Sequence, residues 1–312
     1  MSPPIEVVTV TPNPAIDWTL VVPGFTAGVV NRVESHHAQP AGKGVNVAAA
    51  LARAGHRVAV TGWLGRENAA AFEAFFTERD IEDRFVRVPG ETRVGIKITD
   101  PPGQRTTDVN FPGQPPAPAD RAALMDRVLA LSAAPAGGAA PWLVLAGSLP
   151  PGVDPGFYCE LAMLATAAGA RVVLDSSGEP LRRALKAEPL ILKPNQHELE
   201  ALAGGALTTR AAVIAAARAL LAGETELVVV SLGADGALFV ARDRVVVATS
   251  PAVEVRTTVG AGDAMVAGIV AGRLGRLELP ELARLASAFA LEAVTGVARG
   301  EWLSEVSVEE AS

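Results

Sequence analysis

The chain has little cysteine and lysine, no excess of positive charge and no long hydrophobic run. Cys159 is the one cysteine among 312 residues, which excludes an internal disulfide and a multi-cysteine zinc site. Lysine and arginine number 27 against 34 aspartates and glutamates, giving a net charge of −7. This charge argues against a protein that binds nucleic acid or a membrane surface. The apolar run 264–271 is far shorter than the roughly 18 residues that span a bilayer.

The N-terminal sequence lacks the charged region that opens a secretory signal peptide, because its first basic residue is Arg32. Together with the single cysteine, this predicts a reduced, cytoplasmic setting. Hydrophobic residues make up 49% of the chain, so it can bury a large core. Only four positions are lysine, namely Lys43, Lys97, Lys186 and Lys193, and two of them fall in the motifs below.

The C-terminal two thirds of the chain alternates short β-branched apolar runs with helical segments. This alternation predicts βαβ units around a mainly parallel sheet, and 236–240 with 244–249 predicts a hairpin. The expected strands are 142–146, 171–174, 190–192 and 226–231, and the expected helices are 156–168, 180–186, 196–203, 210–221, 262–274 and 280–295.

The N-terminal third contains additional strands. Strand 7–10 and helices 45–54 and 69–77 belong to the main body, whereas 18–22, 32–38, 93–99 and 106–110 alternate as half-exposed strands do. We expect two insertions, about 14–40 and 90–113, to form one small sheet over the body of a single domain, 1–312. A small sheet with one apolar face can pack against its twin, so a homodimer through this lid is expected.

Residues 257–265, Thr-Thr-Val-Gly-Ala-Gly-Asp-Ala-Met, open a predicted helix. The backbone N–H groups of Gly260, Ala261 and Gly262 and the helix dipole would form an anion site. Asp263 beside that site would remove a proton from a hydroxyl that attacks the anion. The alternative is an ordinary helix start with an acidic first turn.

Residues 41–46, Ala-Gly-Lys-Gly-Val-Asn, do not form a Walker phosphate loop. The required glycine five positions before Gly42 is missing, and Gly44 replaces the required serine or threonine. A flexible turn at Gly42 with one cation and one amide suits a sugar phosphate, with Lys43 on the phosphate and Asn46 on a hydroxyl. The alternative is a turn with an N-cap.

Residues 192–199, Leu-Lys-Pro-Asn-Gln-His-Glu-Leu, combine the end of a strand with the start of a helix. Asn195 and Glu198 could hold Mg²⁺ or its waters beside a triphosphate. The alternative is a capping box made by the same two residues, and His197 is expected to be a solvated bystander.

Three weaker signals complete the candidate site. Ser148 lies in the loop 147–152 after a buried strand, Asp17 could accept hydrogen bonds from sugar hydroxyls, and Arg93 could clamp a phosphate. Taken alone, Asp17 and Arg93 are more typical of surface charge, and Ser148 of an ordinary loop. The turn after strand 226–231 permits close approach of a nucleotide, although hairpins use the same residues, namely Ser231, Leu232, Gly233, Ala234, Asp235 and Gly236.

Taken together, these motifs resemble the PfkB (ribokinase-like) sugar kinases, with the matching residues spread from 13 to 265. Residues 260–263 resemble the second family signature and 41–48 the first. Segments 9–17, 30–33 and 147–152 resemble the phosphofructokinase-type branch. Ala41 departs from the pattern, since the family often has a second glycine there.

The resemblance implies an α/β fold: a three-layer α/β/α sandwich with a mainly parallel sheet and a small β-sheet lid, using ATP and Mg²⁺. It implies that Asp263 is the base, that 260–262 form the anion hole, and that Asn195 and Glu198 lie near Mg²⁺ and hold it through water. Lys193, Asn195, 231–236 and Gly262 would contact ATP. The sugar phosphate would contact Asp17, Gly42, Lys43, Asn46, Arg93, Ser148 and Asp263.

The implied reaction is phosphorylation of fructose 1-phosphate by ATP, with tagatose 6-phosphate as the alternative acceptor. An unphosphorylated acceptor would leave Lys43 and Arg93 without an anion. A non-catalytic sugar-phosphate sensor is a remoter alternative, which would have no need of Asp263. A Rossmann dehydrogenase is excluded because the first strand is not followed by Gly-x-Gly-x-x-Gly.

Overall fold

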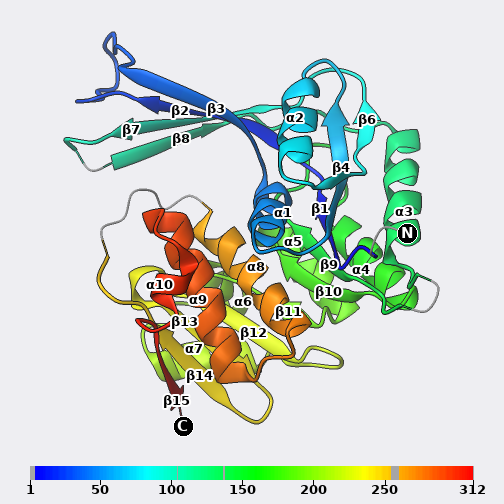
Figure 1. Cartoon of the computed structure of the whole chain (residues 1–312), viewed down its shortest axis with the longest axis vertical. Helices are drawn as coiled ribbons and strands as arrows, with labels where there is room; N and C mark the ends of the chain where they lie inside the picture. Colours follow the sequence, from blue (N-terminus) through cyan, green and yellow to red (C-terminus); the bar gives the residue numbers. More distant parts are fainter. Residues whose placement is uncertain (1–3, 104, 136–137, 254–259, 312) are drawn as a thin grey trace.

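The computed structural model describes residues 4–103, 105–135, 138–253 and 260–311. The start of the motif 257–265, at 257–259, lies outside these residues. The described chain forms a large sheet with helices on both faces and a separate small sheet that projects from the body (Figure 1). This arrangement confirms the predicted α/β fold with a mainly parallel sheet.

The large sheet has 11 strands in the order β15-β14-β13-β12-β11-β10-β9-β1-β4-β5, and β6 also pairs with β4. All pairings from β12 to β5 and β6 are parallel, whereas β13, β14 and β15 add an antiparallel edge. The strands are β1 (Val7–Thr11), β4 (Val58–Gly65), β5 (Glu82–Asp83), β6 (Val86–Val88), β9 (Trp142–Ala146), β10 (Arg171–Asp175), β11 (Ile191–Leu192), β12 (Leu227–Ser231), β13 (Ala237–Ala241), β14 (Val245–Thr249) and β15 (Ser307–Ala311).

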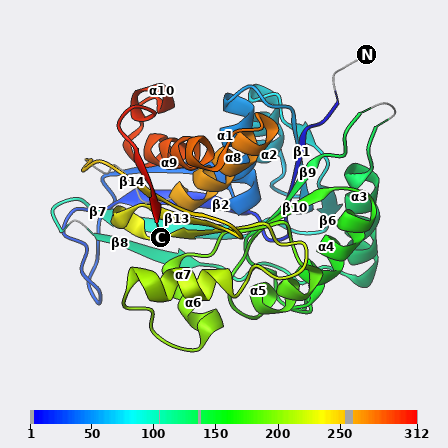
Figure 2. The ribbon, with the colours of Figure 1, turned by 90° about the horizontal axis from the view of Figure 1, so that it is seen from below.

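Alternation along the central strands divides the core into two layers. Val7 packs with the helices on one face of the sheet, and its neighbour Val8 packs with those on the other. The first layer contains α1 (Lys43–Arg53), α2 (Ala70–Glu78), α8 (Ala261–Leu274) and α9 (Leu279–Thr295), and α10 (Arg299–Trp302) contacts α9. The second contains α3 (Pro118–Ser132), α4 (Phe157–Ala167), α5 (Gly178–Ala184), α6 (Gln196–Ala203) and α7 (Arg210–Arg218) (Figure 2).

The small sheet contains β2 (Ala15–Val21), β3 (Ser35–Ala41), β7 (Val94–Asp100) and β8 (Arg105–Asn110), in the order β3-β2-β7-β8. The pairing of β2 with β7 is parallel, and both outer pairings are antiparallel. The strand expected at 32–38 starts instead at Ser35, because it pairs with β2 only up to Val21. The prediction of a separate small sheet is confirmed.

Because side chains alternate along each strand, the small sheet has two unlike faces. One cross-strand row is polar and contains Gln39, Asp17, Gly95 and Asn110. The neighbouring row is mostly apolar and contains Ala38, Trp18, Ile96 and Val109. No helix in the described ranges is long and apolar enough to cross a membrane.

Candidate active site

The predicted site residues gather where the carboxyl ends of the parallel strands meet the start of α8. Ser148 follows β9, Lys193 and Asn195 follow β11, and Ser231 ends β12. Strand order brings them together, since β9, β10, β11 and β12 are successive neighbours. Open α/β sheets bind their ligands at this edge.

The first turn of α8 presents free backbone donors. Gly260 caps the helix in the left-handed conformation, with φ +81°, which a glycine adopts at no steric cost. The N–H groups of Ala261, Gly262 and Asp263 have no intrahelical partner there, and none of them donates a hydrogen bond within the described ranges. A Cβ on Gly262 would lie 3.4 Å from the Lys193 Nζ atom. The bare glycine therefore lets this ammonium come close to the amides.

Asp263 is a buried carboxyl in this turn, with 7% of the residue exposed. Burial, and next the negative charge of Asp175, raise the pKa of Asp263 to about 6. Asn46 on α1 donates a hydrogen bond of 2.8 Å from Nδ2 to Oδ2 of Asp263 and favours the ionised form. The structure thus joins two predicted residues that lie 217 positions apart.

Asp175 is the residue that our sequence analysis missed. It ends β10, is completely buried, and lies between Lys43 Nζ at 2.9 Å and Lys193 Nζ at 3.5 Å. Burial acts to raise the pKa of Asp175, but the two lysines outweigh it and hold the pKa below its usual value. A carboxylate at the end of an apolar parallel strand was the signal that could have identified it.

The two lysines differ in exposure. The Lys43 side chain is 37% exposed, whereas that of Lys193 is 4% exposed. Burial acts to lower the pKa of Lys43, but Asp175 outweighs that effect and raises it, so the ammonium stays charged. Lys43 is therefore the cation of the pair that an incoming phosphate can reach.

Asn195 and Glu198 form the capping box that was the alternative interpretation. Asn195 Oδ1 accepts from the Glu198 N–H at 2.8 Å, and Glu198 Oε2 accepts from the Asn195 N–H at 2.8 Å. His197 is solvent-exposed, as expected. The residues fit a Mg²⁺ ion, because the second oxygen of Glu198 makes no bond within the described ranges and Oδ2 of Asp175 is buried without a partner. Mg²⁺ needs few protein ligands where phosphates and waters complete its shell.

The predicted sugar residues lie where the small sheet joins the body. Asn13 links them, since its Nδ2 donates to the Ser148 hydroxyl at 3.2 Å. Arg93 donates to the carbonyls of Asn13, at 3.2 and 3.3 Å, and Phe111, at 3.1 Å. Burial lowers the pKa of Arg93. Its guanidinium thus braces this junction, a role that the sequence did not indicate.

Other predicted positions are structural as well as accessible. Gly42 has φ +129°, and a Cβ there would come within 2.8 Å of Thr11 Cγ2. After β12 the chain forms a single 3₁₀ turn at Gly233–Asp235, whose residues are exposed. Only glycine fits at position 236, because a Cβ on Gly236 would lie 2.0 Å from the Ala248 carbonyl oxygen. This turn therefore keeps its exposed backbone beside the carboxyl end of β12.

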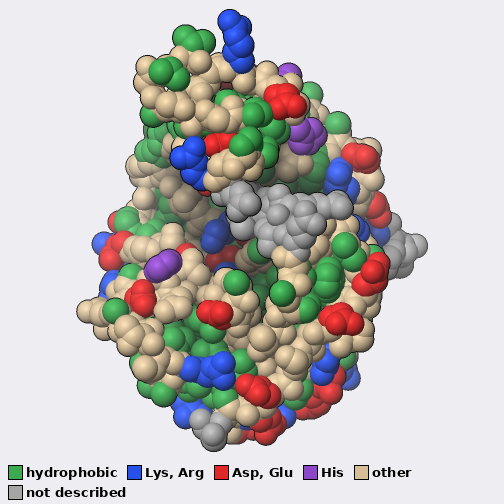
Figure 3. Space-filling view, turned by 90° about the vertical axis from the view of Figure 1, so that its left-hand side faces the viewer, with side chains coloured by type: hydrophobic (Ala, Val, Ile, Leu, Met, Phe, Trp, Pro, Cys, Tyr) green, Lys and Arg blue, Asp and Glu red, His purple; other side chains and the backbone are tan. Residues whose placement is uncertain are grey.

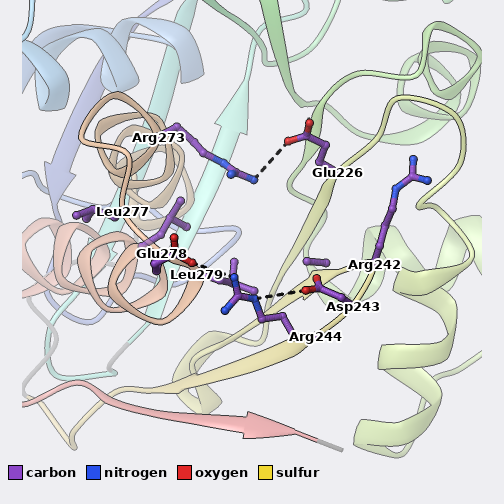
Figure 4. A pocket seen from close by; sticks show the side chains of 10 residues that line it. Glu226, Arg242, Asp243, Arg244, Arg273, Leu277, Glu278 and Leu279 are labelled. Carbon is purple, nitrogen blue, oxygen red and sulfur yellow. Dashed lines mark hydrogen bonds and ion pairs between the residues drawn. The ribbon is translucent and has the colours of Figure 1, made fainter.

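Figure 3 shows the surface hollowed between the small sheet and the body, with side chains of both charges at the bottom of the hollow. A second cavity, of about 300 Å³, lies at the opposite edge, near the start of β12 (Figure 4). Its arginines and acids largely face one another, with Arg244 on Glu278 at 3.0 Å and Arg273 on Glu226 at 3.9 Å. None of the predicted site residues lines this second cavity.

Comparison with known proteins agrees with the motifs. The pfkB family of carbohydrate kinases matches residues 8–301. A 1-phosphofructokinase from Rhodobacter capsulatus is 48% identical over 290 residues, covering 93% of this chain and 90% of the relative. The 1-phosphofructokinase of Escherichia coli (strain K12) is 39% identical over 290 residues, covering 93% of this chain and 91% of the relative.

Solved structures agree in fold. Phosphofructokinase-2 from Escherichia coli, in complex with substrates and products, superposes with a TM-score of 0.89 and 27% identity, covering 96% of this chain and 98% of that one. A possible 1-phosphofructokinase from Thermotoga maritima gives a TM-score of 0.86 and 28% identity, covering 98% of this chain and 100% of that one. With the family match spanning most of its length, this chain belongs to the pfkB family of carbohydrate kinases.

Proposed function

We propose that this protein transfers the γ-phosphoryl group of ATP to fructose 1-phosphate, giving fructose 1,6-bisphosphate and ADP. The observation that carries the proposal is the buried carboxyl of Asp263 beside the free amides of α8, in a chain whose relatives are 1-phosphofructokinases. A base next to an anion cradle suits attack of a hydroxyl on a phosphoryl group.

Asp263 would act as the base. Asn46 occupies Oδ2, so Oδ1 is the oxygen available to take the proton of a primary sugar hydroxyl. That hydroxyl oxygen then attacks the γ-phosphorus in line while the bond to the ADP oxygen breaks. The pKa of about 6 leaves Asp263 mostly ionised at neutral pH and more basic than an ordinary aspartate.

The chain stabilises the negative charge that the transferring phosphoryl group carries. The free N–H groups at the start of α8 are held in fixed positions from which they attract this negative charge, and the helix dipole adds to the attraction. Lys193 lies within reach of the same turn, and Asp175 holds its ammonium in place. Because these donors are already oriented, little reorganisation is needed as charge develops.

Mg²⁺ suits the acidic side of this site. Glu198, together with Asn195, would hold the ion directly or through its waters. When bound, the ion would neutralise charge on the β- and γ-phosphates. The capping box keeps both side chains at the start of α6 in a fixed orientation before any ligand arrives.

The phosphate already on the sugar is the proposed partner of Lys43. This ammonium is part-exposed, stays charged and lies at the turn that begins α1. Asp17 and Ser148 would contact sugar hydroxyls, with Arg93 bracing the loop between them. We place tagatose 6-phosphate second, because the same groups could accept the reversed ketose.

A coupled ADP-release assay with Mg-ATP tests the proposal. The acceptors to compare are fructose 1-phosphate, fructose 6-phosphate, tagatose 6-phosphate and free fructose. We expect kcat/KM for fructose 1-phosphate to exceed the others at least tenfold. A preference for tagatose 6-phosphate would reassign the substrate and leave the chemistry intact. No turnover with any acceptor would favour a sugar-phosphate sensor.

We also propose a cytoplasmic homodimer formed through the small sheets. Trp18 is 42% exposed and Val109 48% exposed on the apolar row of that sheet, and such a row is costly to leave in water. A related phosphofructokinase-2 from Escherichia coli has a tetrameric form.

A further inference from the structure

We propose that Lys97, which belongs to none of the sequence motifs, is a positioning residue for sugar binding. Its ammonium would hold one carboxylate oxygen of Asp17, which leaves the other oxygen free to accept a hydrogen bond from a sugar hydroxyl. This inference rests on the proposed sugar-phosphate kinase activity. It concerns the recognition of the sugar rather than the transfer step.

The geometry of the pair is specific. Lys97 on β7 places Nζ 2.8 Å from Oδ2 of Asp17 on the neighbouring strand β2, and both side chains are 15% exposed. Asp108 on β8 is 3.9 Å away from the same ammonium and 52% exposed. Asp17 is therefore the principal partner. An ion pair sequestered to this degree is screened less than a surface pair and holds its geometry.

The second oxygen of Asp17 lies over a position that has no side chain. If position 95 carried a side chain in place of Gly95, its Cβ would lie only 2.5 Å from Asp17 Oδ1 and 3.2 Å from Asn110 Oδ1. Within the described ranges no donor bonds to this Asp17 oxygen. Two acceptor oxygens thus converge above Gly95, as a site for a hydroxylated ligand would require.

The pair is continuous with the candidate active site. The negative charge of Asp17 acts on Arg93, whose guanidinium binds the Asn13 carbonyl. Asn13 in turn binds the hydroxyl of Ser148. Lys97 therefore acts at the outer end of a connected set of groups that reaches the body.

The charge of Asp17 also explains why a cation is needed. A partly buried carboxylate close to a sugar phosphate would repel the phosphate dianion if no cation neutralised it. That repulsion would weaken binding of the sugar phosphate. ATP binds at the other end of the site, so its affinity should depend little on Lys97.

The test is steady-state kinetics of Lys97→Met, with fructose 1-phosphate and ATP varied separately. We expect KM for fructose 1-phosphate to rise at least tenfold, while KM for ATP stays within twofold and kcat within threefold. Lys97→Arg should restore KM to within threefold of the wild type, because a guanidinium keeps a positive charge beside Asp17. An unchanged KM in folded Lys97→Met would overturn the proposal, as would failure of Lys97→Arg to restore it.

Two controls and a second route make the test specific. Lys186→Met removes the exposed lysine distant from these residues, and Asp108→Asn removes the secondary partner; neither should change KM for the sugar phosphate by more than twofold. If Lys97→Met does not fold, Gly95→Ala displaces Asp17 Oδ1 without removing the ion pair and should raise the same KM. An unaltered KM in Gly95→Ala would also contradict the inference. Lack of turnover by the wild-type enzyme would instead refute the proposed function.

Discussion

At the scale of the residue, Asp263, our proposed base, is a carboxyl whose burial disfavours its negative charge. We predict that Asp263→Asn lowers kcat by about 10²–10⁴-fold, because an amide cannot take the proton of the attacking hydroxyl. ATP binding should persist, since the amides of α8 are unchanged. Rapid-quench kinetics and ATP binding by calorimetry check this. Near-normal turnover would remove Asp263 from the role of base.

The raised pKa of Asp263 predicts a pH dependence. Protonated Asp263 cannot act as a base, so kcat/KM should fall as the pH drops through about 6. The hydrogen bond from Asn46 favours the ionised form, so Asn46→Ala should move this midpoint to higher pH. A pH–rate profile of both enzymes measures the shift. A midpoint that stays in place would show that Asn46 does not influence the base.

The same pKa also affects stability. The folded-state pKa lies above the ordinary 3.8, so the folded protein binds more protons than the unfolded chain between about pH 4 and 6. The contribution of Asp263 to the free energy of unfolding is therefore full below pH 4 and is lost as the pH rises through 6. Asp263→Asn should be at least as stable as the wild type at pH 7.5, by urea denaturation, with a smaller advantage at pH 5.

At the scale of the element, the start of α6 is a capping box whose two side chains we also propose as the holders of Mg²⁺. Asn195→Ala removes the cap to the Glu198 amide and should lower the free energy of unfolding by about 1 kcal/mol. Glu198→Gln retains an acceptor for the Asn195 amide, so its stability should remain near the wild-type value while the Mg²⁺ concentration for half-maximal activity rises. Thermal unfolding and Mg²⁺ titration separate the two. Equal Mg²⁺ dependence in Glu198→Gln and the wild type would argue against the metal role.

At the scale of the whole molecule, the small sheet predicts the oligomeric state. The row Ala38, Trp18, Ile96 and Val109 offers a second copy an apolar face, whereas the polar row lies on the opposite side. Light scattering should give twice the 32.1 kDa chain mass, and Trp18→Lys should give the monomer. Val30→Lys on the loop between β2 and β3, where valine is already 89% exposed, is the control and should remain dimeric. A monomeric wild type would contradict the dimer.

The amino-acid sequence by itself determined the features that depend on neighbouring residues. The start of α8 at Gly260, the capping box of Asn195 and Glu198, and the alternation of strands and helices follow from local hydrogen bonds, glycine conformation and hydrophobic period. Strand β4 and helix α3 were missed. Every residue of β4 is buried, so β4 lacks the alternation of a half-exposed strand, and Thr61 and Gly62 interrupt the apolar run that marked the buried strand 142–146.

Only the tertiary structure decided which distant charges meet. Lys43 and Asp175 are 132 positions apart, and the order of strands in the sheet brings them to 2.9 Å. The pairing of β2 with β7 likewise sets Lys97 against Asp17. Such contacts depend on strand order and register, which no local pattern specifies. The sequence could therefore name candidate site residues such as Lys43 and Asp17 without giving their charged partners.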